Sequence, residues 1–293
     1  MNKKVFVAAA TGFQGGAIAS SLIEQGYSIR TLARKKETND FEREGIEVHI
    51  GDWADAHDLS NALKDVKAAV YTFPLIFELE KAISYTQNFI QSCEKNAVDL
   101  VVFNTGFDLP KEKTGLLALD LKLEIKALFD ASNLKVITLM PDVYIDNLAA
   151  PWSIPVILEH GILPYPIPTQ TKIPWLSHVD LANYVVAALQ RPELAGETLA
   201  IGGNLWTGEE IAAAIGKKIN KEIKFVGLSA DDFEQQLLPA FGAVPAKEIS
   251  NLYRYLRKNY ERIIAKGFAQ TQTLLSVRPQ TLTEWVASIN WEG

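Results

Sequence analysis

A glycine-rich segment near the start of the chain has the residue types of a phosphate-binding turn. Residues 8–16 read Ala-Ala-Ala-Thr-Gly-Phe-Gln-Gly-Gly and lie between a short apolar run and a helical pattern. Gly12 leaves no Cβ between the backbone and a ligand, and Gly15 lets the helix pack closely against the strand. Free N–H groups at the start of that helix would point at the pyrophosphate of a dinucleotide. The residues expected to bind it are Thr11, Gly12, Phe13, Gln14 and Gly15.

One position departs from the G-x-x-G-x-x-G pattern, because Ala9 stands in place of its first glycine. Alanine fits at little cost if the backbone φ there is negative. If φ is positive, the strain is about 1 kcal/mol, and the cofactor would bind more weakly or be slightly displaced. The sequence leaves both cases open.

The second expected strand ends in basic residues. Proteins that bind NAD usually place an acidic residue near this point to hold the ribose 2′-hydroxyl. Here the sequence reads Ala33-Arg34-Lys35-Lys36. The Arg34 guanidinium can bind a 2′-phosphate through two hydrogen bonds and stack on the adenine, with Lys35 beside it. The pattern favours NADP(H) over NAD(H), and Lys36 is expected to be solvated.

Three later segments also end expected strands, where ligands bind in parallel α/β sheets. Gly51-Asp52-Trp53 follows the third strand, and Asp52 is placed to contact the adenine amino group. Thr72-Phe73-Pro74 follows the fourth strand and should run beside the cofactor. Thr105-Gly106 follows the fifth, where the nicotinamide side begins. The further cofactor contacts expected here are Asp52, Trp53, Thr72, Phe73, Pro74 and Thr105.

The elements that must position these residues alternate along the first half of the chain. Short apolar runs predict strands at residues 5–9, 28–32, 47–50, 68–73, 100–104 and 136–140. Apolar residues at helical spacing predict helices at 15–25, 58–63, 78–96 and 118–131. Such alternation predicts right-handed βαβ units and a doubly wound parallel sheet, the Rossmann fold.

The pattern changes after Pro141. Six prolines between residues 151 and 174 predict an irregular region packed over one edge of the sheet. Beyond it we expect a strand at 198–201 and helices at 179–190, 208–215, 230–238, 247–266 and 282–289. We assign residues 1–150 to a dinucleotide-binding domain and 151–293 to a smaller, mostly helical substrate lobe. Helix 179–190 is expected to pack back on the sheet.

Composition limits the possible partners. The chain has 48% hydrophobic and 22% charged residues, as ordinary globular proteins do. Its net charge of -6 disfavours nucleic acid and anionic membranes as partners. No window reaches the ~18 apolar residues that span a bilayer. The single cysteine, Cys93, excludes an intrachain disulfide, so a cytoplasmic location is expected. Cys93 itself is expected to be a buried packing residue, and no metal site is expected.

Taken together, these segments resemble an atypical short-chain dehydrogenase/reductase of the NmrA-like group. The resemblance covers residues 5 to about 203, and the last ninety or so carry no motif. It implies an NADP(H) site in the N-terminal half and a small C-terminal substrate lobe. The matching segments are residues 10–15, Leu32-Ala33-Arg34, Gly51-Asp52, Ala118-x-x-x-Lys122, Met140-Pro141 with Asn147-Leu148, and residues 178–182.

The resemblance also bears on catalysis. Ordinary members of this superfamily use Tyr-x-x-x-Lys, with the tyrosine as general acid. Counting back from Lys122 places Ala118 at the tyrosine position, and a methyl group cannot donate a proton. Isoflavone-reductase-like relatives also lack the tyrosine and keep the lysine, which binds the nicotinamide ribose and is a candidate acid or base. The resemblance implies the same role for Lys122; the alternative is a solvated helix lysine.

Other candidates for catalysis follow from position. Thr105 stands where the superfamily often has serine, and is a candidate to hold a substrate carbonyl. Tyr144 is the preferred substitute proton donor, ahead of Asn147 and His178.

Two functions from different classes remain open. The first is an NADPH-dependent oxidoreductase that transfers hydride to a small aromatic or quinone-like acceptor. Such an acceptor delocalises charge and needs little acid help, and Phe73, Phe77, Phe107, Tyr144 and Trp152 are candidates to line its pocket. The second is a redox sensor that binds NADP(H) without turnover and acts through a protein partner; Ala9 and Ala118 favour it. A sugar-nucleotide epimerase is disfavoured, because that chemistry relies on the missing tyrosine. A homodimer is compatible with either function.

Overall fold

The computed structural model describes residues 4–34, 45–72 and 76–291. A parallel sheet with the strand order β3-β2-β1-β4-β5-β6-β9 forms its centre. Its strands are β1 (Lys4–Val7), β2 (Ser28–Ala33), β3 (Ile46–Ile50), β4 (Ala68–Thr72), β5 (Leu100–Asn104), β6 (Val136–Met140) and β9 (Thr198–Ala200). The order reverses at β1, so the carboxyl ends of β1 and β4 border the crevice where ligands bind in doubly wound sheets. The predicted Rossmann fold is confirmed.

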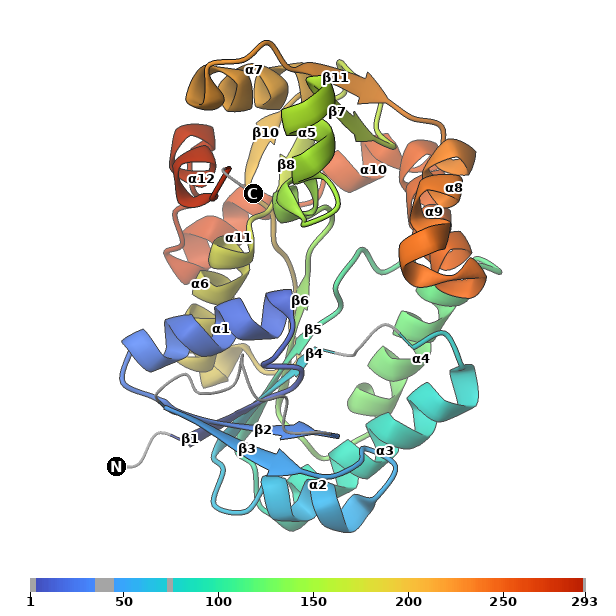
Figure 1. Cartoon of the computed structure of the whole chain (residues 1–293). Helices are drawn as coiled ribbons and strands as arrows, with labels where there is room; N and C mark the ends of the chain where they lie inside the picture. Colours follow the sequence, from blue (N-terminus) through green and yellow to red (C-terminus); the bar gives the residue numbers. More distant parts are fainter. Residues whose placement is uncertain (1–3, 35–44, 73–75, 292–293) are drawn as a thin grey trace.

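Helices cover both faces of this sheet (Figure 1). On one face lie α1 (Phe13–Glu24) and α6 (His178–Leu189), which pack against each other and share a core with the sheet. On the other lie α2 (Ala56–Ala62), α3 (Leu79–Lys95) and α4 (Leu117–Asp130). Because successive strand residues point to opposite faces, Phe6 and Ala8 enter the second core while Val5 and Val7 enter the first.

A second lobe stands at the carboxyl ends of the strands (Figure 1). It has its own apolar core and two small sheets, β10-β8 and β11-β7. Its strands are β7 (Ile162–Tyr165), β8 (Ile173–Trp175), β10 (Asn204–Trp206) and β11 (Lys224–Gly227). Its helices are α5 (Ile154–His160), α7 (Gly208–Ile219), α8 (Ala230–Phe241), α9 (Ala243–Lys258), α10 (Tyr260–Ile264) and α12 (Leu282–Ser288). Between the last two, α11 (Phe268–Leu275) packs against α6 and β9 of the main sheet.

The proline-rich region is more regular than the sequence indicated, so the prediction of an irregular segment is wrong. Pro155 lies in the first turn of α5, where its missing N–H costs nothing. Pro164 and Pro174 lie in two-stranded sheets, whose outer edges need no ladder donor. The helix expected at 247–266 is also two helices, because the chain breaks at Asn259 between α9 and α10.

The chain passes between the lobes more than once. After β6 it builds α5, β7 and β8, and then returns to the main sheet with α6 and β9 before entering the second lobe again. The division at residue 150 stays a prediction. Within the described residues, no helix is both long and apolar enough to cross a bilayer.

Candidate functional site

The turn between β1 and α1 shows which glycine the fold itself requires. A Cβ on Gly15 would lie 2.1 Å from the Ala9 carbonyl oxygen, so only glycine fits there. A Cβ on Gly12 would lie 3.5 Å from the same oxygen, which is ordinary contact. Nothing in the described protein therefore demands a glycine at position 12. The missing side chain leaves room for a ligand at the start of α1, where free N–H groups favour an anion.

Ala9 adopts a positive φ, which is the strained one of the two conformations considered from the sequence. Its φ is 53°, in the left-handed region. The carbonyl oxygen of Ala9 accepts a hydrogen bond of 2.9 Å from the Gly12 N–H, which closes the turn. An L-residue with this φ carries strain of about 1 kcal/mol or more. The loop keeps the shape that a glycine would give it, at a cost in stability.

Asn104, at the end of β5, connects four segments of the site. Its amide nitrogen donates to Gln14 Oε1 at 2.9 Å and to Thr72 Oγ1 at 3.4 Å. Its side-chain oxygen accepts from the Gly106 N–H at 3.0 Å and from Tyr144 Oη at 3.4 Å. From the sequence, Asn104 is only the last residue of a predicted strand. The sequence feature that could have indicated a role in the site is an amide side chain at the end of a central strand, directly before Thr105-Gly106.

A cavity of about 380 Å³ opens beside these residues, and we refer to it as cavity one. Thr105, Gly106 and Lys122 form its polar side with Asn104 and the glycine turn, and Ala118 lies in its wall. Lys122 Nζ donates to the Thr105 carbonyl oxygen at 2.5 Å. Burial lowers the pKa of Lys122 to about 8. Lys122 is therefore held in the cavity wall as a partly buried amine rather than as a solvated helix lysine.

The two other proposed catalytic residues are already engaged. The Thr105 hydroxyl donates to the Phe107 carbonyl at 2.6 Å, so it would have to turn to hold a substrate carbonyl. Tyr144 is buried and donates to Asn104, and burial raises its pKa. A raised pKa makes its phenol a weaker acid, which argues against Tyr144 as the substitute proton donor.

The predicted adenine end of the site is only partly described. Lys35, Phe73 and Pro74 lie outside the described residues. Thr11 and Phe13 are exposed at the turn. Asp52 is exposed, and its Oδ1 accepts from the Ala54 N–H at 2.9 Å.

Trp53, which the sequence placed beside the cofactor, packs into the core of the second helix layer. Its ring lies 5.8 Å from that of Phe89 in a stacked arrangement, and 5.9 Å from that of Tyr71. Only the remaining edge of the half-buried indole is available to a ligand.

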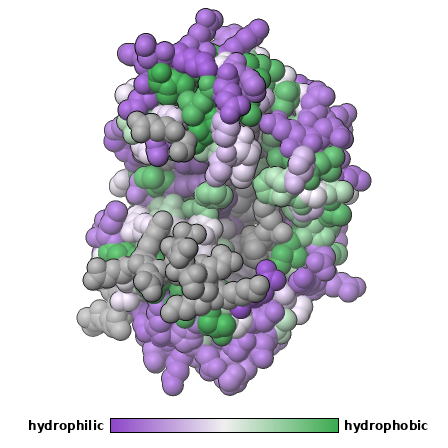
Figure 2. Space-filling model, in the orientation of Figure 1, coloured by the Kyte–Doolittle hydropathy of each residue, from purple (hydrophilic) through white to green (hydrophobic). Residues whose placement is uncertain are grey.

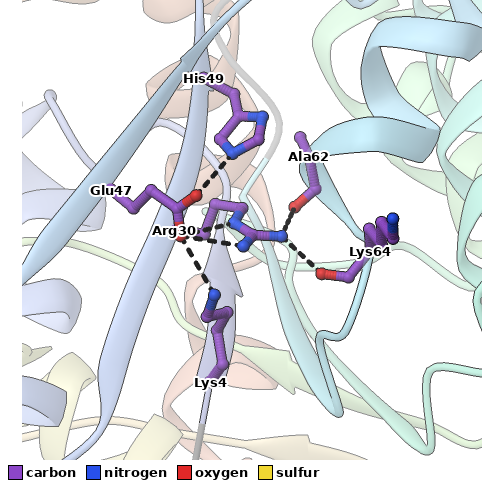
Figure 3. Close-up of polar contacts among 6 residues, drawn as sticks. All are labelled: Lys4, Arg30, Glu47, His49, Ala62 and Lys64. Atoms are coloured by element: carbon purple, nitrogen blue, oxygen red, sulfur yellow. Dashed lines mark hydrogen bonds and ion pairs between the residues drawn. The ribbon is translucent and has the colours of Figure 1, made fainter.

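The two arginines of β2 and its end have different roles. Arg30 is buried and donates to Glu47 on β3 at 2.9 and 3.0 Å, and to the carbonyls of Ala62, at the end of α2, and Lys64, just after it (Figure 3). Arg34 is exposed beyond the end of the strand, with no side-chain bond to any other described residue. Arg30 is committed to the fold, whereas Arg34 is available to a ligand.

Two further side chains, Lys4 and His49, contact Glu47 beside Arg30. Lys4 Nζ lies 3.1 Å from Glu47 Oε2, and His49 Nε2 lies 2.8 Å from Oε1 (Figure 3). Burial raises the pKa of Glu47, but the contacts with His49, Arg30 and Lys4 outweigh it and hold the pKa at about 2. The cluster fixes β2 against β3 and α2, and so sets the direction in which Arg34 leaves the sheet.

A second cavity, of about 370 Å³, adjoins the first, and we refer to it as cavity two. The two share Phe13, Gln14, Gly106 and Leu252 in their walls. Figure 2 shows a hollow between the two lobes, with hydrophobic residues around part of its rim. Aromatic side chains dominate cavity two: Phe107, Tyr144, Trp152, Tyr165, Phe233, Phe241 and Tyr253. Of the aromatic residues predicted for the pocket, Phe77 lines cavity one instead, and Phe73 lies outside the described residues.

His178 connects the glycine turn with cavity two. Its ring stacks on Phe13 at 6.5 Å and lies 5.2 Å from the ring of Tyr144. It is the first residue of α6, and burial lowers its pKa although Asp146 opposes this. Burial therefore favours the neutral imidazole, which offers a hydrogen bond rather than a charge.

Buried charges tie the second lobe to the ends of β5 and β6. Lys266 binds both Asp108, at 2.8 Å, and Asp142, and Arg262 also binds Asp108. Asp142 lies in the wall of cavity two, and its Oδ2 has no hydrogen-bond partner among the described residues. Burial raises the pKa of Asp142 to about 7, against the opposing effect of Lys266.

Comparison with known proteins agrees with this arrangement. The model of the NmrA-like family matches residues 1–286, almost the whole chain. The chain belongs to the NmrA-like family. The family match extends past the motifs seen in the sequence and includes most of the second lobe.

Several solved structures have the same fold as this chain, although their sequences are only distantly similar to it. A nucleoside-diphosphate-sugar epimerase from Staphylococcus aureus superposes with a TM-score of 0.77 at 20% identity, covering 98% of this chain and 99% of that one. An NADPH-dependent quinone oxidoreductase from Escherichia coli, complexed with NADPH, gives 0.73 at 20%, covering 97% and 98%. A triphenylmethane reductase from Citrobacter sp., complexed with NADP(H), gives 0.77 at 17%, covering 98% and 100%. At these identities the likeness concerns the fold.

Proposed function

We propose that this protein is an NADPH-dependent oxidoreductase that reduces a small, flat aromatic or quinone-like acceptor. The observation that carries the proposal is the junction of two cavities at Gly106 and Gln14. Cavity one begins at the glycine turn, and cavity two is lined mainly by aromatic side chains. Solved structures of similar fold include a quinone reductase and a dye reductase, each bound to NADPH or NADP(H).

The residues present fit a dinucleotide phosphate. The space that a side chain on Gly12 would occupy is open, and the N-terminus of α1 favours an anion. Arg34, free of other bonds to described residues, would bind the 2′-phosphate, as the sequence predicts, with Lys35 after it. Asp52 and Thr72 would contact the cofactor along the strand ends, and Lys122 would bind the nicotinamide ribose from the wall of cavity one.

Bound NADPH would supply the hydride. The chain itself would orient the reactants, because the walls that the two cavities share place cofactor and acceptor side by side, and the Asn104–Gln14 bond fixes part of that shared wall. With Ala118 at the tyrosine position, no phenol donates a proton there. A quinone-like acceptor spreads the arriving charge over its ring, so it needs little acid assistance.

A calorimetric titration of the apo-protein with NADPH, and separately with NADH, tests the cofactor part. We expect NADPH to bind at least tenfold more tightly, and Arg34→Asp to remove that preference while leaving NADH binding nearly unchanged. Arg30 is unsuitable as a control because it holds the fold, whereas Lys36→Asp is a suitable one. Equal affinities for the two cofactors in the wild-type protein would rule out the role of Arg34.

The second candidate is a sensor that binds NADP(H) without turnover and acts through a protein partner. The strained Ala9 and the methyl of Ala118 favour it. Oxidation of bound NADPH by a simple quinone, followed by its absorbance, decides between the two. Turnover at a rate above the uncatalysed reaction excludes the sensor as the sole role. Tight binding without turnover over a panel of quinones and cationic dyes favours it.

A further inference from the structure

Two tyrosines from distant parts of the chain meet in the wall of cavity two. Tyr165 ends β7, Tyr253 lies on α9, and their hydroxyl groups are hydrogen-bonded to each other. Both side chains are buried, and their rings lie 5.4 Å apart edge to face. Phe233 packs against both, at 5.7 and 5.2 Å, so the two phenols are held in place. The fold has built a rigid polar group inside an aromatic cavity.

The hydrogens of this pair do not all find acceptors. Each phenol carries one O–H hydrogen, and the bond between the two hydroxyls uses one of them. Asn147 Nδ2 donates to Tyr165 Oη at 3.1 Å, so this neighbour also supplies a hydrogen rather than taking one. In the described part of the chain, no other side chain or backbone oxygen accepts from either hydroxyl. Whichever tyrosine donates to the other, one phenol hydrogen is left over.

The remaining hydrogen is available to a molecule in the cavity, because both tyrosines line it. A ligand that supplies an oxygen there gains a hydrogen bond from a donor that is already held in place, so such a ligand is favoured. Burial raises the pKa of Tyr165 to about 12 and also raises that of Tyr253. The pair therefore stays neutral at physiological pH and acts as a hydrogen-bond donor rather than as a source of protons.

We propose that Tyr165 and Tyr253 together form the subsite that binds a carbonyl or quinone oxygen of the substrate in cavity two. This inference rests on the proposed function, because it assigns the aromatic acceptor to that cavity. The shared walls of the two cavities at Gly106 and Gln14 place such a ligand next to the cofactor site. The tyrosine that is missing at Ala118 is thus matched by a donor pair from the second lobe, which selects the substrate without protonating it.

The test compares two ligands that differ in one oxygen. 1-Tetralone has an aromatic ketone, and tetralin has the same ring system without the oxygen. Both are titrated into the protein saturated with NADP⁺, so that no hydride transfer can occur. We expect the wild-type protein to bind 1-tetralone about tenfold more tightly than tetralin.

Three variants test which hydroxyl group donates to the ketone. In Tyr165→Phe or Tyr253→Phe the other phenol keeps a free hydrogen, so each single variant should retain most of the preference for the ketone. The double variant should bind both ligands about equally. The changes remove only hydroxyl groups, so the ring packing with Phe233 persists. The affinity for NADP⁺ should be the same in all four proteins, because neither tyrosine lines cavity one.

The outcomes separate this inference from the proposed function. A double variant that still prefers 1-tetralone as strongly as the wild type overturns the inference, and so does a wild-type protein that binds the two ligands equally or binds neither. Loss of the preference in either single variant also overturns the shared pair, because the remaining phenol should still donate to the ketone. If the double variant loses the preference but the wild type reduces no quinone, the subsite stands and the proposed activity fails. If the wild type reduces a quinone but the double variant still prefers 1-tetralone to tetralin, the proposed activity stands and the subsite fails.

Discussion

At the scale of single residues, the sequence did not decide whether the φ of Ala9 is negative or positive, and the structure shows the strained, positive value. Ala9 has a φ of 53°, and Ala97 has a similar φ of 51°. Ala97 lies just past the C-terminus of α3, far from the site. Glycine at either position should raise the melting temperature by ~2 °C, because the relief of left-handed strain outweighs the entropy of the more flexible unfolded chain. Thermal unfolding of both variants measures this.

The matched alanine separates strain from ligand binding. Ala9→Gly should bind NADPH at least as tightly as the wild type, since it restores the usual residue of the turn. Ala97→Gly should leave that affinity unchanged. The explanation by strain fails if Ala97→Gly is stabilised while Ala9→Gly melts at a lower temperature than the wild type.

Lys122 predicts a dependence of stability on pH. Burial lowers its pKa to about 8, from an ordinary value of 10.5, so folding disfavours the protonated amine. The folded state then holds fewer protons than the unfolded state between these values, and stability from this group rises with pH across that window. Lys122→Met should therefore melt at a higher temperature than the wild type at pH 7, and this advantage should shrink at pH 10. An advantage that grows with pH would contradict the assignment.

At the scale of elements, the turn from β1 into α1 separates folding from binding. Gly15→Ala would bring a Cβ to 2.1 Å from the Ala9 carbonyl oxygen, so we expect a loss of several kcal/mol or no folded protein. Gly12→Ala has room for its Cβ, at 3.5 Å from that oxygen. It should melt within about 2 °C of the wild type but bind NADPH at least tenfold more weakly, as calorimetry would measure. If Gly12→Ala binds NADPH normally, the turn does not hold the phosphates.

The elements also show what the sequence could predict. The segments that became β1, β4 and β5 are largely continuous apolar runs, and the structure buries most of their residues, so the sequence predicted them directly. By contrast, β3 alternates Ile46, Val48 and Ile50 with polar residues, and none of its residues is fully buried. The strands β7 and β8 contain Pro164 and Pro174, so the sequence did not predict them. Proline is excluded from strands that pair on both sides, whereas β7 and β8 each pair with one strand only.

The candidate site was predictable to the extent that it is local in sequence. The glycine turn, Arg34 and Lys122 each follow from a short motif. The Tyr165–Tyr253 pair joins residues 88 positions apart, and Asn104 contacts Gln14 across 90. Neither contact leaves a pattern in one sequence, because only the packing of the second lobe and the order of the strands bring the partners together.

At the scale of the whole molecule, the ion cluster at Lys266 holds the lobes together. Lys266 neutralises Asp108 and Asp142, whose carboxylates are almost fully buried. Lys266→Met should cost about 3–5 kcal/mol at pH 8, because it leaves buried carboxylates with less compensation. Arg278→Met, which breaks an exposed pair with Glu284, should cost far less, because water screens that pair in the folded protein. Chemical denaturation of both variants measures the two losses.

The loss should also depend on pH. Because burial raises the pKa of Asp142 to about 7, from an ordinary value of 3.8, its ionised form is disfavoured by folding, and stability from this group falls as pH rises through that window. Without Lys266 the pKa rises further, so the penalty of Lys266→Met should be smaller at pH 5 than at pH 8. An equal penalty at both values would show that Asp142 does not carry the effect.

The path of the chain between the lobes has a consequence for its synthesis. Strands β1 to β6 can pair once Met140 has left the ribosome, but the outer edge of β6 stays open until Thr198 to Ala200 arrive, and the apolar side of α1 waits for α6. In between, the ribosome delivers α5, β7 and β8, whose own partners β10 and β11 come later still. The growing chain thus holds an unpaired strand edge and unfinished small sheets at the same time, which is the condition in which nascent proteins associate wrongly or recruit chaperones. Slow translation before Thr198 would lengthen that exposure.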